Sequence, residues 1–488
     1  MLWIRLFLLA SLGLGVAWPL LWPFVSLRHT PLTFDGSLVT LVQHTAWLVL
    51  GTVVLSLPPG FLAALLLERS DLPGRSLIYT ILLVALFLPL PLFVAGWMPH
   101  LPPVQSMHLW PEGLLPSIFL HTLSGFTWVV LIIGVFLRHA RSDGEDHART
   151  VGSPLWVAWH VVLPTAWPSI LAAALWLAMQ TACQVTITDL YQVRTLAGEI
   201  FLQLDAPGST YPIQGAIPVA LLQVVVGMAL IVIAARGFAR RDEPGAMRRR
   251  STPLFRLGRG RWSMGLLLLG LSAAILLVPT VTFLLRAGMM GDPPTFSLGK
   301  LAQRLAKAMV VDAPLWQRTI CLGLGTGILC ASLGLLACWC VRCSPVLQVG
   351  LALLMALAWA MPGPLVGMGV LGVLDLVVSF SEPFTSVPAR WLWHGPSILP
   401  VLLVNVIRWL PCAVCLIWPE MRNLPREFRD EAQLVGLRPL QEFWQIGWPM
   451  THSTVLLAAL TTAILSLGEV SASKLVSTPG ADCFGERL

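Results

Sequence analysis

The chain has little charge. Of its 488 residues, Asp, Glu, Lys and Arg make up 11%, whereas soluble globular proteins carry about 25% charged residues. Hydrophobic residues make up 56%, and apolar runs of about 20 residues recur, each long enough to cross a bilayer core. This composition excludes a soluble enzyme and predicts an all-α polytopic membrane protein.

The sequence also lacks the motifs of common catalytic sites. It contains no Gly-x4-Gly-Lys-Ser/Thr, and therefore no P-loop for ATP. It contains no His-Glu-x-x-His, and its ten histidines are scattered. The stretch 367–372 matches Gly-x-Gly-x-x-Gly, but it lies in an apolar run, where glycines favour close helix packing over dinucleotide binding. We expect no cofactor and no catalytic residue in this chain.

The nine cysteines do not suggest a disulfide framework. Cys412 and Cys415 form a Cys-x-x-Cys pair within an apolar run, without a histidine or second pair to complete a metal or redox site. We interpret them as small apolar side chains packed in a membrane helix.

Eleven apolar runs fall into two sets. The first set lies near 3–27, 38–67, 76–98, 115–137, 167–190 and 214–235, and the second near 263–287, 314–341, 346–376, 397–419 and 453–475. The 346–376 run contains Pro362 and Pro364, which are capable of breaking it. The first run has a short basic start but no clear cleavage site, so we expect an uncleaved helix rather than a signal peptide.

A basic linker separates the two sets. Residues 236–261 contain nine arginines, which beside membrane spans mark the cytoplasmic side rather than a nucleic-acid site. With a cytoplasmic N-terminus, most of the 31 Lys and Arg residues fall inside. The predicted organisation is a first half over 1–235, this linker, and a second half over 262–488.

Two polar segments share the pattern Asp-x-Ala-x-x-Val-Gly. One contains Asp146, Ala148 and Gly152, and the other contains Asp430, Ala432 and Gly436. Each continues through a tryptophan-rich stretch to a proline. Since glycine ends helices and proline opens them, the pattern predicts a short helix, a glycine turn and a second short helix. With a cytoplasmic N-terminus, both loops (140–164 and 424–449) fall inside.

The two halves are predicted to be parallel repeats. Gln43-His44-Thr45 and the following Gly51-Thr52 recur as Gln317-Arg318-Thr319 and Gly325-Thr326, at one constant offset in the numbering. The loops recur at a slightly larger offset, and Gln184 then aligns with Glu469. Repeated halves are typical of transporters. The second half ends after its fifth span, so we expect a twelfth helix to be missing from this chain.

The loops resemble the EAA loop of ABC-importer permeases, in which Glu-Ala-Ala is followed by Gly and later by Ile-x-Leu-Pro. The residues that match this family or occupy its positions are Asp146, Ala148, Gly152, Pro164, Asp430, Glu431, Ala432, Gly436, Ile446 and Pro449. Asp430 stands in place of the leading Glu, Trp448 in place of Leu, and the first loop is one residue shorter.

The resemblance implies a type I permease fold in the bacterial inner membrane, with each loop docked on one of two ATPase subunits that bind ATP and Mg. It also implies a periplasmic binding protein that delivers the substrate. Segments 44–75, 188–195, 408–411 and 466–469 resemble fused iron(III)-type permeases, which implies iron(III) as substrate. Thiamine, sulfate or a polyamine remain alternatives, as do a secondary transporter and a polytopic membrane enzyme.

Polar residues in or beside the apolar runs are candidates for the translocation path. A charge at bilayer depth is costly and usually faces a cavity or a partner. These candidates are Gln184, Asp189, Asn405, Arg408 and Glu469. Arg408 and Glu469 either pair with each other or line the pore. None of the candidates resembles an iron site, because the chain has three tyrosines and few hard oxygen ligands.

Overall fold

The protein is described from a computed structural model. The structure describes residues 2–25, 37–101, 113–139, 143–148, 150–205, 254–290, 295–381, 397–422 and 434–478, with isolated residues in 221–229 and 424–431. Most of the predicted span 214–235, most of the linker 236–261 and the chain end after 478 lie outside these residues.

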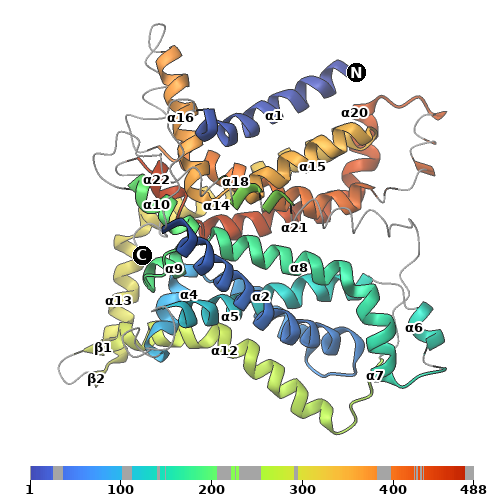
Figure 1. Cartoon of the computed structure of the whole chain (residues 1–488), viewed down its shortest axis with the longest axis vertical. Coiled ribbons are helices and arrows are strands. Elements are labelled where there is room, and N and C mark those ends of the chain that lie inside the picture. The colour runs from blue at the N-terminus through green and yellow to red at the C-terminus, as the bar shows by residue number, and fades with distance from the viewer. Residues whose placement is uncertain are drawn as a thin grey trace. The chain divides into compact units, whose positions relative to one another are not determined.

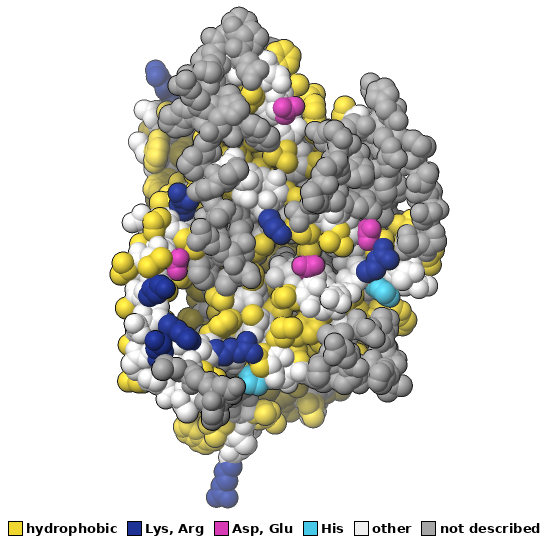
Figure 2. All heavy atoms as spheres, turned by 90° about the vertical axis from the view of Figure 1, so that its left-hand side faces the viewer, with side chains coloured by type: hydrophobic (Ala, Val, Ile, Leu, Met, Phe, Trp, Pro, Cys, Tyr) yellow, Lys and Arg dark blue, Asp and Glu magenta, His cyan; other side chains and the backbone are white. Residues whose placement is uncertain are grey.

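The fold is all-α and typical of a multi-pass membrane protein (Figure 1). Within the described residues, eight helices are long and apolar enough to cross a membrane, and a bent helix pair supplies a ninth crossing if it counts as one span. Hydrophobic side chains cover much of the face drawn in Figure 2. The predicted membrane character is confirmed, whereas eleven spans are not.

The helices form two compact units, which we call the N-terminal unit (Asp35–Gly198 and Ala229–Val310) and the C-terminal unit (Met1–Phe34, Glu199–Met228 and Val311–Leu488). Elements of the N-terminal unit are α2 (Ser37–Arg69), α3 (Arg75–Leu86), α4 (Leu90–Trp97), η2 (Met98–His100), α5 (Leu114–His139), α6 (Asp143–Ala148), α7 (Pro154–Val157), η4 (Ala158–Val162), α8 (Leu163–Cys183), α9 (Thr186–Leu190), α12 (Gly260–Gly288), β1 (Met289–Met290), β2 (Thr295–Phe296) and α13 (Leu298–Val311). Elements of the C-terminal unit are α1 (Leu2–Val25), α14 (Ala313–Val341), α15 (Pro345–Ala360), α16 (Gly363–Ser381), α18 (Leu399–Arg422), α20 (Pro439–Glu442), η5 (Phe443–Gly447), α21 (Trp448–Leu467) and α22 (Ser473–Val476). Helix α10 (Leu196–Asp205) crosses the boundary between the two units.

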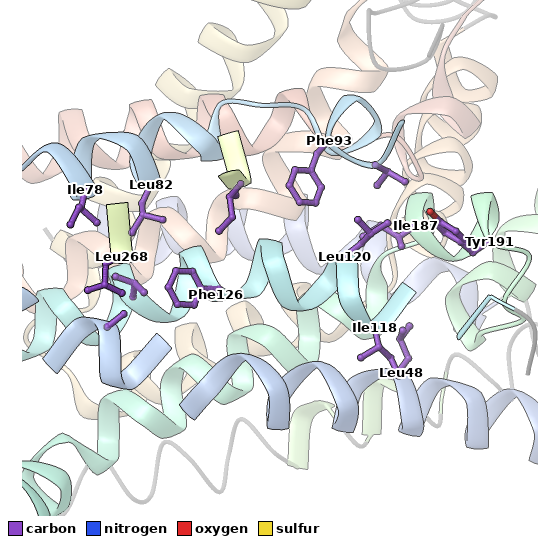
Figure 3. Packing of buried hydrophobic residues seen from close by; sticks show 14 of the residues in the cluster. Leu48, Ile78, Leu82, Phe93, Ile118, Leu120, Phe126, Ile187, Tyr191 and Leu268 are labelled. Atoms are coloured by element: carbon purple, nitrogen blue, oxygen red, sulfur yellow. The ribbon is translucent and has the colours of Figure 1, made fainter. Parts of the chain in front are cut away.

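In the N-terminal unit, α2, α5 and α8 pack against one another. Gly51 lies against Ile118 and Gly60 against Val129, so α2 and α5 run in the same direction. If α2 and α5 both span the membrane, the chain between them must return across it. This part of the chain contains α3 and α4, which meet at a bend of 102°. A buried apolar cluster joins these helices to α9 and α12, as Figure 3 shows for Phe126 and Leu268.

In the C-terminal unit, α14, α18 and α21 pack against one another in the same way. The predicted single span 346–376 was wrong, since α15 ends at Ala360 and α16 begins at Gly363. Met361 precedes Pro362, whose ring forces the preceding residue out of the helical region, and Met361 is extended, with ψ of 126°. The break is thus encoded by one proline.

The compact units do not follow the order of the sequence. Helix α1, the first of the chain, packs on α16 and α15 of the C-terminal unit, whereas α12 packs on α3 and α4 of the N-terminal unit. The packing is close at both places because glycines meet prolines: Gly369 lies against Pro19 and Gly96 against Pro279.

Candidate functional site

The first loop precedes α8 and has the predicted sequence of elements. Helix α6 ends in a turn in which the amide of Gly152 donates to the carbonyl of Ala148 at 2.9 Å. Ser153 then caps α7, its hydroxyl accepting from the amide of Trp156 at 3.3 Å. A Cβ on Gly152 would lie 2.5 Å from the ring of Trp156, so a larger residue at this turn would displace that ring.

The second loop precedes α21 and needs its glycine for a different reason. Gly436 has φ of 73°, a left-handed conformation that other residues rarely adopt, and a Cβ there would meet no neighbour. The amide of Val435 donates to the carbonyl of Glu431 at 3.0 Å, and α20 begins three residues after the glycine. Asp430 and Ala432 lie outside the described residues, as does the side chain of Asp146.

Both loops run into the following span through a π-helical turn. These turns, η4 and η5, end immediately before α8 and α21. Pro164 and Pro449 occupy the first turn of those helices, and Ile446 lies within η5. Proline lacks the amide hydrogen, and its ring clashes with the preceding turn of the helix. In both loops, the π-helical turn lies directly before the position where the proline interrupts the regular helical hydrogen bonds.

Large apolar side chains project from both loops. Val151 and Leu434 are 84% and 87% exposed, which is unusual for residues beside a packed helix bundle. The other exposed large apolar side chains of the two loops among the described residues are Leu155, Trp156, Trp159, Phe428, Val435, Leu440 and Trp444. Clustered exposed apolar side chains mark interaction surfaces, so each loop carries a candidate interaction surface.

An arginine at the end of α2 holds the first loop. Arg69 is buried and its guanidinium contacts the Glu145 carboxylate of α6 at 2.9 Å. The same segment is bound from a second side, because the carbonyl of Arg69 accepts from the amide of Phe255 at 2.9 Å. Sequence analysis selected Asp146 in this loop and missed Glu145.

A second arginine holds the second loop at the end of α14. Arg342 contacts the Glu442 carboxylate of α20 at 2.7 Å, and its guanidinium lies 3.1 Å from the centre of the Trp339 ring. Trp339 also packs edge-on against Phe443. This anchor was likewise missed, since Arg342 and Glu442 are 100 residues apart and nothing local links them.

Arg408 and Glu469 lie side by side. The sequence left open whether they pair with each other or line the pore, and their positions agree with pairing. Their charged atoms are 3.5 Å apart and both side chains are 7% exposed. Arg408 also donates to the carbonyl of Met361 at 2.5 Å, while Glu469 accepts from the hydroxyl of Ser471 at 2.8 Å. The pair thus connects the α15–α16 break to the turn after α21.

Asn405 lies one helical turn before Arg408 and is fully buried. Neither its amide nitrogen nor its amide oxygen has a hydrogen-bond partner among the described residues. A buried amide without partners is costly. Asn405 therefore remains a candidate binding residue.

The two translocation-path candidates of the N-terminal unit, Gln184 and Asp189, do not lie within a long apolar helix. Helix α8 ends at Cys183, so Gln184 lies just beyond the helix and Asp189 is exposed on the separate helix α9. The prediction of a single span 167–190 with Asp189 at its end was therefore wrong. Gln184 donates to the hydroxyl of Thr186 at 3.0 Å. The neighbouring Tyr191 is buried, and burial raises the pKa of its phenol.

Among the described residues, no group of three or more His, Cys, Asp or Glu side chains could hold a metal ion. No family model matches the chain, and neither a curated protein nor a solved structure is similar to it.

Proposed function

We propose that this chain is the permease subunit of an ABC importer in a bacterial inner membrane, with a cytoplasmic N-terminus. Its two loops dock two copies of an ATPase subunit, which bind ATP and Mg, and a periplasmic binding protein delivers the substrate to the opposite side. The observation that carries the proposal is the pair of exposed apolar loops, each anchored by an Arg–Glu ion pair beside its unit's core helices.

Matching contacts in the two units support a duplicated, parallel arrangement. The contacts Gly51–Ile118 and Gly60–Val129 correspond to Gly325–Leu402 and Gly334–Ala413. The two glycines of the C-terminal unit have residue numbers larger than those of the N-terminal unit by one constant amount. The residues that these glycines contact differ between the units by a second constant amount, which is slightly larger. These are the offsets at which the sequence motifs recur. Such agreement between contacts and motifs is expected of a duplicated chain.

The chain after the last core helix follows the same correspondence. Gln184 bonds the hydroxyl of Thr186, and Glu469 bonds the hydroxyl of Ser471. The carbonyl of Gln184 accepts from the Thr188 hydroxyl, as the carbonyl of Glu469 does from Ser473. All three positions are shifted by the same offset. This agreement favours two pseudo-equivalent halves around one pathway, a layout used by transporters.

The loops separate this proposal from its alternatives. A secondary transporter can have repeated halves and buried charges, but it needs no pair of anchored loops with exposed apolar residues on one side of the membrane. A membrane enzyme needs a reactive cluster. We propose iron(III) as substrate, with thiamine, sulfate or a polyamine as alternatives, and we propose no nucleic-acid partner.

The test starts by finding genes for an ATPase and a periplasmic binding protein beside the gene of this chain. Uptake is then measured in membrane vesicles that contain all three proteins. Radiolabelled iron(III), thiamine, sulfate and spermidine are supplied in parallel. We expect ATP-dependent uptake of one of them, abolished in the double variant Gly152→Trp with Gly436→Trp although the protein inserts normally. Uptake without ATP, or undiminished uptake by that variant, would overturn the proposal.

A further inference from the structure

Helix α13 lies at the end of α12 and immediately before α14. The paired strands β1 and β2 follow α12, and the amide of Ser297 donates to the carbonyl of Gly288 at 2.9 Å. These contacts return the chain to the end of α12 before α13 begins. Only Asp312 separates α13 from α14, a helix long and apolar enough to span the membrane. Since α12 is also such a helix, α13 is confined to the boundary between membrane and water.

The same unit shows which boundary this is. Just before α12, the amide of Leu257 donates to the Asp71 carboxylate at 2.8 Å. Asp71 lies two residues after Arg69, which anchors α6 through Glu145. Helix α12 has 29 residues and is therefore about 43 Å long. Figure 1 shows α13 at one end of α12 and the loop helices α6 and α7 toward the other. Helix α13 thus lies on the membrane face opposite the first loop.

The sequence of α13 divides into two faces. At 100° per residue, Leu298, Leu301, Leu305 and Met309 fall on one side of the helix, and the three basic residues fall on the other. The basic residues are Lys300, Arg304 and Lys307, and the helix has no acidic residue. This division is typical of a helix that lies in the plane of a membrane interface.

Most of the apolar side is uncovered by the described residues, and Leu301 is partly buried. None of the residues of α13 is buried, and Leu298 and Met309 are 74% and 69% exposed. Arg304 orients the helix by donating to the carbonyls of Arg286 and Ala287 at the end of α12, at 3.3 and 3.1 Å. Figure 2, which faces this end of the molecule, shows Lys and Arg side chains gathered beside exposed hydrophobic ones.

We propose that α13 is a lipid-binding helix, with its apolar side among the acyl chains just beneath the headgroups and Lys300 and Lys307 on the phosphates of anionic phospholipids. A lysine stem can follow the apolar surface while its ammonium reaches the headgroup level. Each basic residue near an anionic surface adds to the attraction. The helix thereby fixes the ends of α12 and α14 at the level of the membrane surface.

Photocrosslinking of the full chain tests the placement. Benzophenone-alanine replaces Leu305 or Met309 on the apolar side, and Gln303 on the polar side, in nanodiscs of phosphatidylcholine and phosphatidylglycerol. Mass spectrometry then measures phospholipid adducts after illumination. We expect adducts at 305 and 309 to exceed those at 303 several-fold. Equal yields at all three positions, or no lipid adduct at 305 and 309, would overturn the proposal.

The charge requirement is tested with the double variant Lys300→Gln and Lys307→Gln, carrying the crosslinker at 305. The phosphatidylglycerol share of the adducts should fall toward its share of the nanodisc lipid. Arg261→Gln, at the opposite end of α12, is the matched control and should leave that share unchanged. An unchanged share in the lysine variant would overturn the assignment of phosphate to these two residues.

Discussion

The two units differ in whether the residues at one pair of equivalent positions carry charge. The C-terminal unit joins the α15–α16 break to the turn after α21 through the buried ion pair of Arg408 and Glu469. At the corresponding positions of the repeat, the N-terminal unit has Ser124 and Gln184. The same local hydrogen bonds form around Gln184 and Glu469. A neutral amide therefore suffices for the turn, and the charges serve another purpose.

The largest effect should come from breaking that pair on one side. Arg408→Ser leaves the Glu469 carboxylate buried without its cation, and we expect a loss of about 3–5 kcal/mol. The double variant Arg408→Ser with Glu469→Gln copies the N-terminal unit and should recover part of that loss. Thermal unfolding of the purified protein measures both. Simple additivity of the two single variants would contradict the pairing.

The loop anchors allow a second comparison, with a somewhat smaller effect. Arg69→Met leaves Glu145 almost fully buried, whereas Arg342→Met leaves Glu442 partly accessible, since the carboxylates are 5% and 16% exposed. We expect Arg69→Met to cost more, by about 1–2 kcal/mol. Limited proteolysis of the two loops and thermal unfolding report the order.

A pair with an exposed arginine in the N-terminal unit is the control for the anchors. The Arg138 side chain contacts Glu68 at 2.8 Å and is 58% exposed, although Glu68 is only 10% exposed. When Arg138 is removed, the Glu68 carboxylate still accepts from the Tyr79 hydroxyl at 2.8 Å, so Arg138→Met should change stability by no more than about 1 kcal/mol. If all three arginine variants lose the same stability, burial of the arginine is not what distinguishes the anchors.

The glycines should give smaller effects than the buried ion pairs and the clearest contrast. Gly436→Ala forces a Cβ into the left-handed region, at a cost of about 1–2 kcal/mol, and no second substitution should rescue it. Gly152→Ala instead meets the ring of Trp156, so adding Trp156→Ala should remove its effect. Thermal unfolding of Gly436→Ala, of Gly152→Ala and of the double variant Gly152→Ala with Trp156→Ala measures the difference. Rescue of Gly436→Ala by a neighbouring truncation would show that space, and not conformation, sets that position.

The spans could be predicted where the apolar runs were uninterrupted. Helices α2, α5, α12, α14 and α18 follow the predicted runs closely, even though α2, α12 and α18 contain prolines within the helix. The 346–376 run failed at Pro362, since hydropathy does not register the extended conformation that proline forces on Met361. The run 167–190 failed for a related reason, because Gln184 adopts an extended backbone (ψ of 127°) that ends α8.

The site divides in a similar way. Arg408 and Glu469 could be predicted as a pair because each is a charge in an otherwise apolar region, which narrows the possible partners. Arg69 and Glu145 could not, because the first loop carries several acidic residues and the sequence does not say which one turns inward. The glycine turns were visible in the pattern, but their two different causes depend on packing and backbone geometry.

The account rests most directly on the claim that both loops dock an ATPase. Benzophenone-alanine placed at Leu155, at Leu440, or at both, in cells that also express the ATPase encoded beside the gene, tests it in one measurement of adduct mass. We predict one ATPase copy on the chain for each single variant and two copies for the double variant. ATPase adducts at neither position, or at only one of them, would contradict the account.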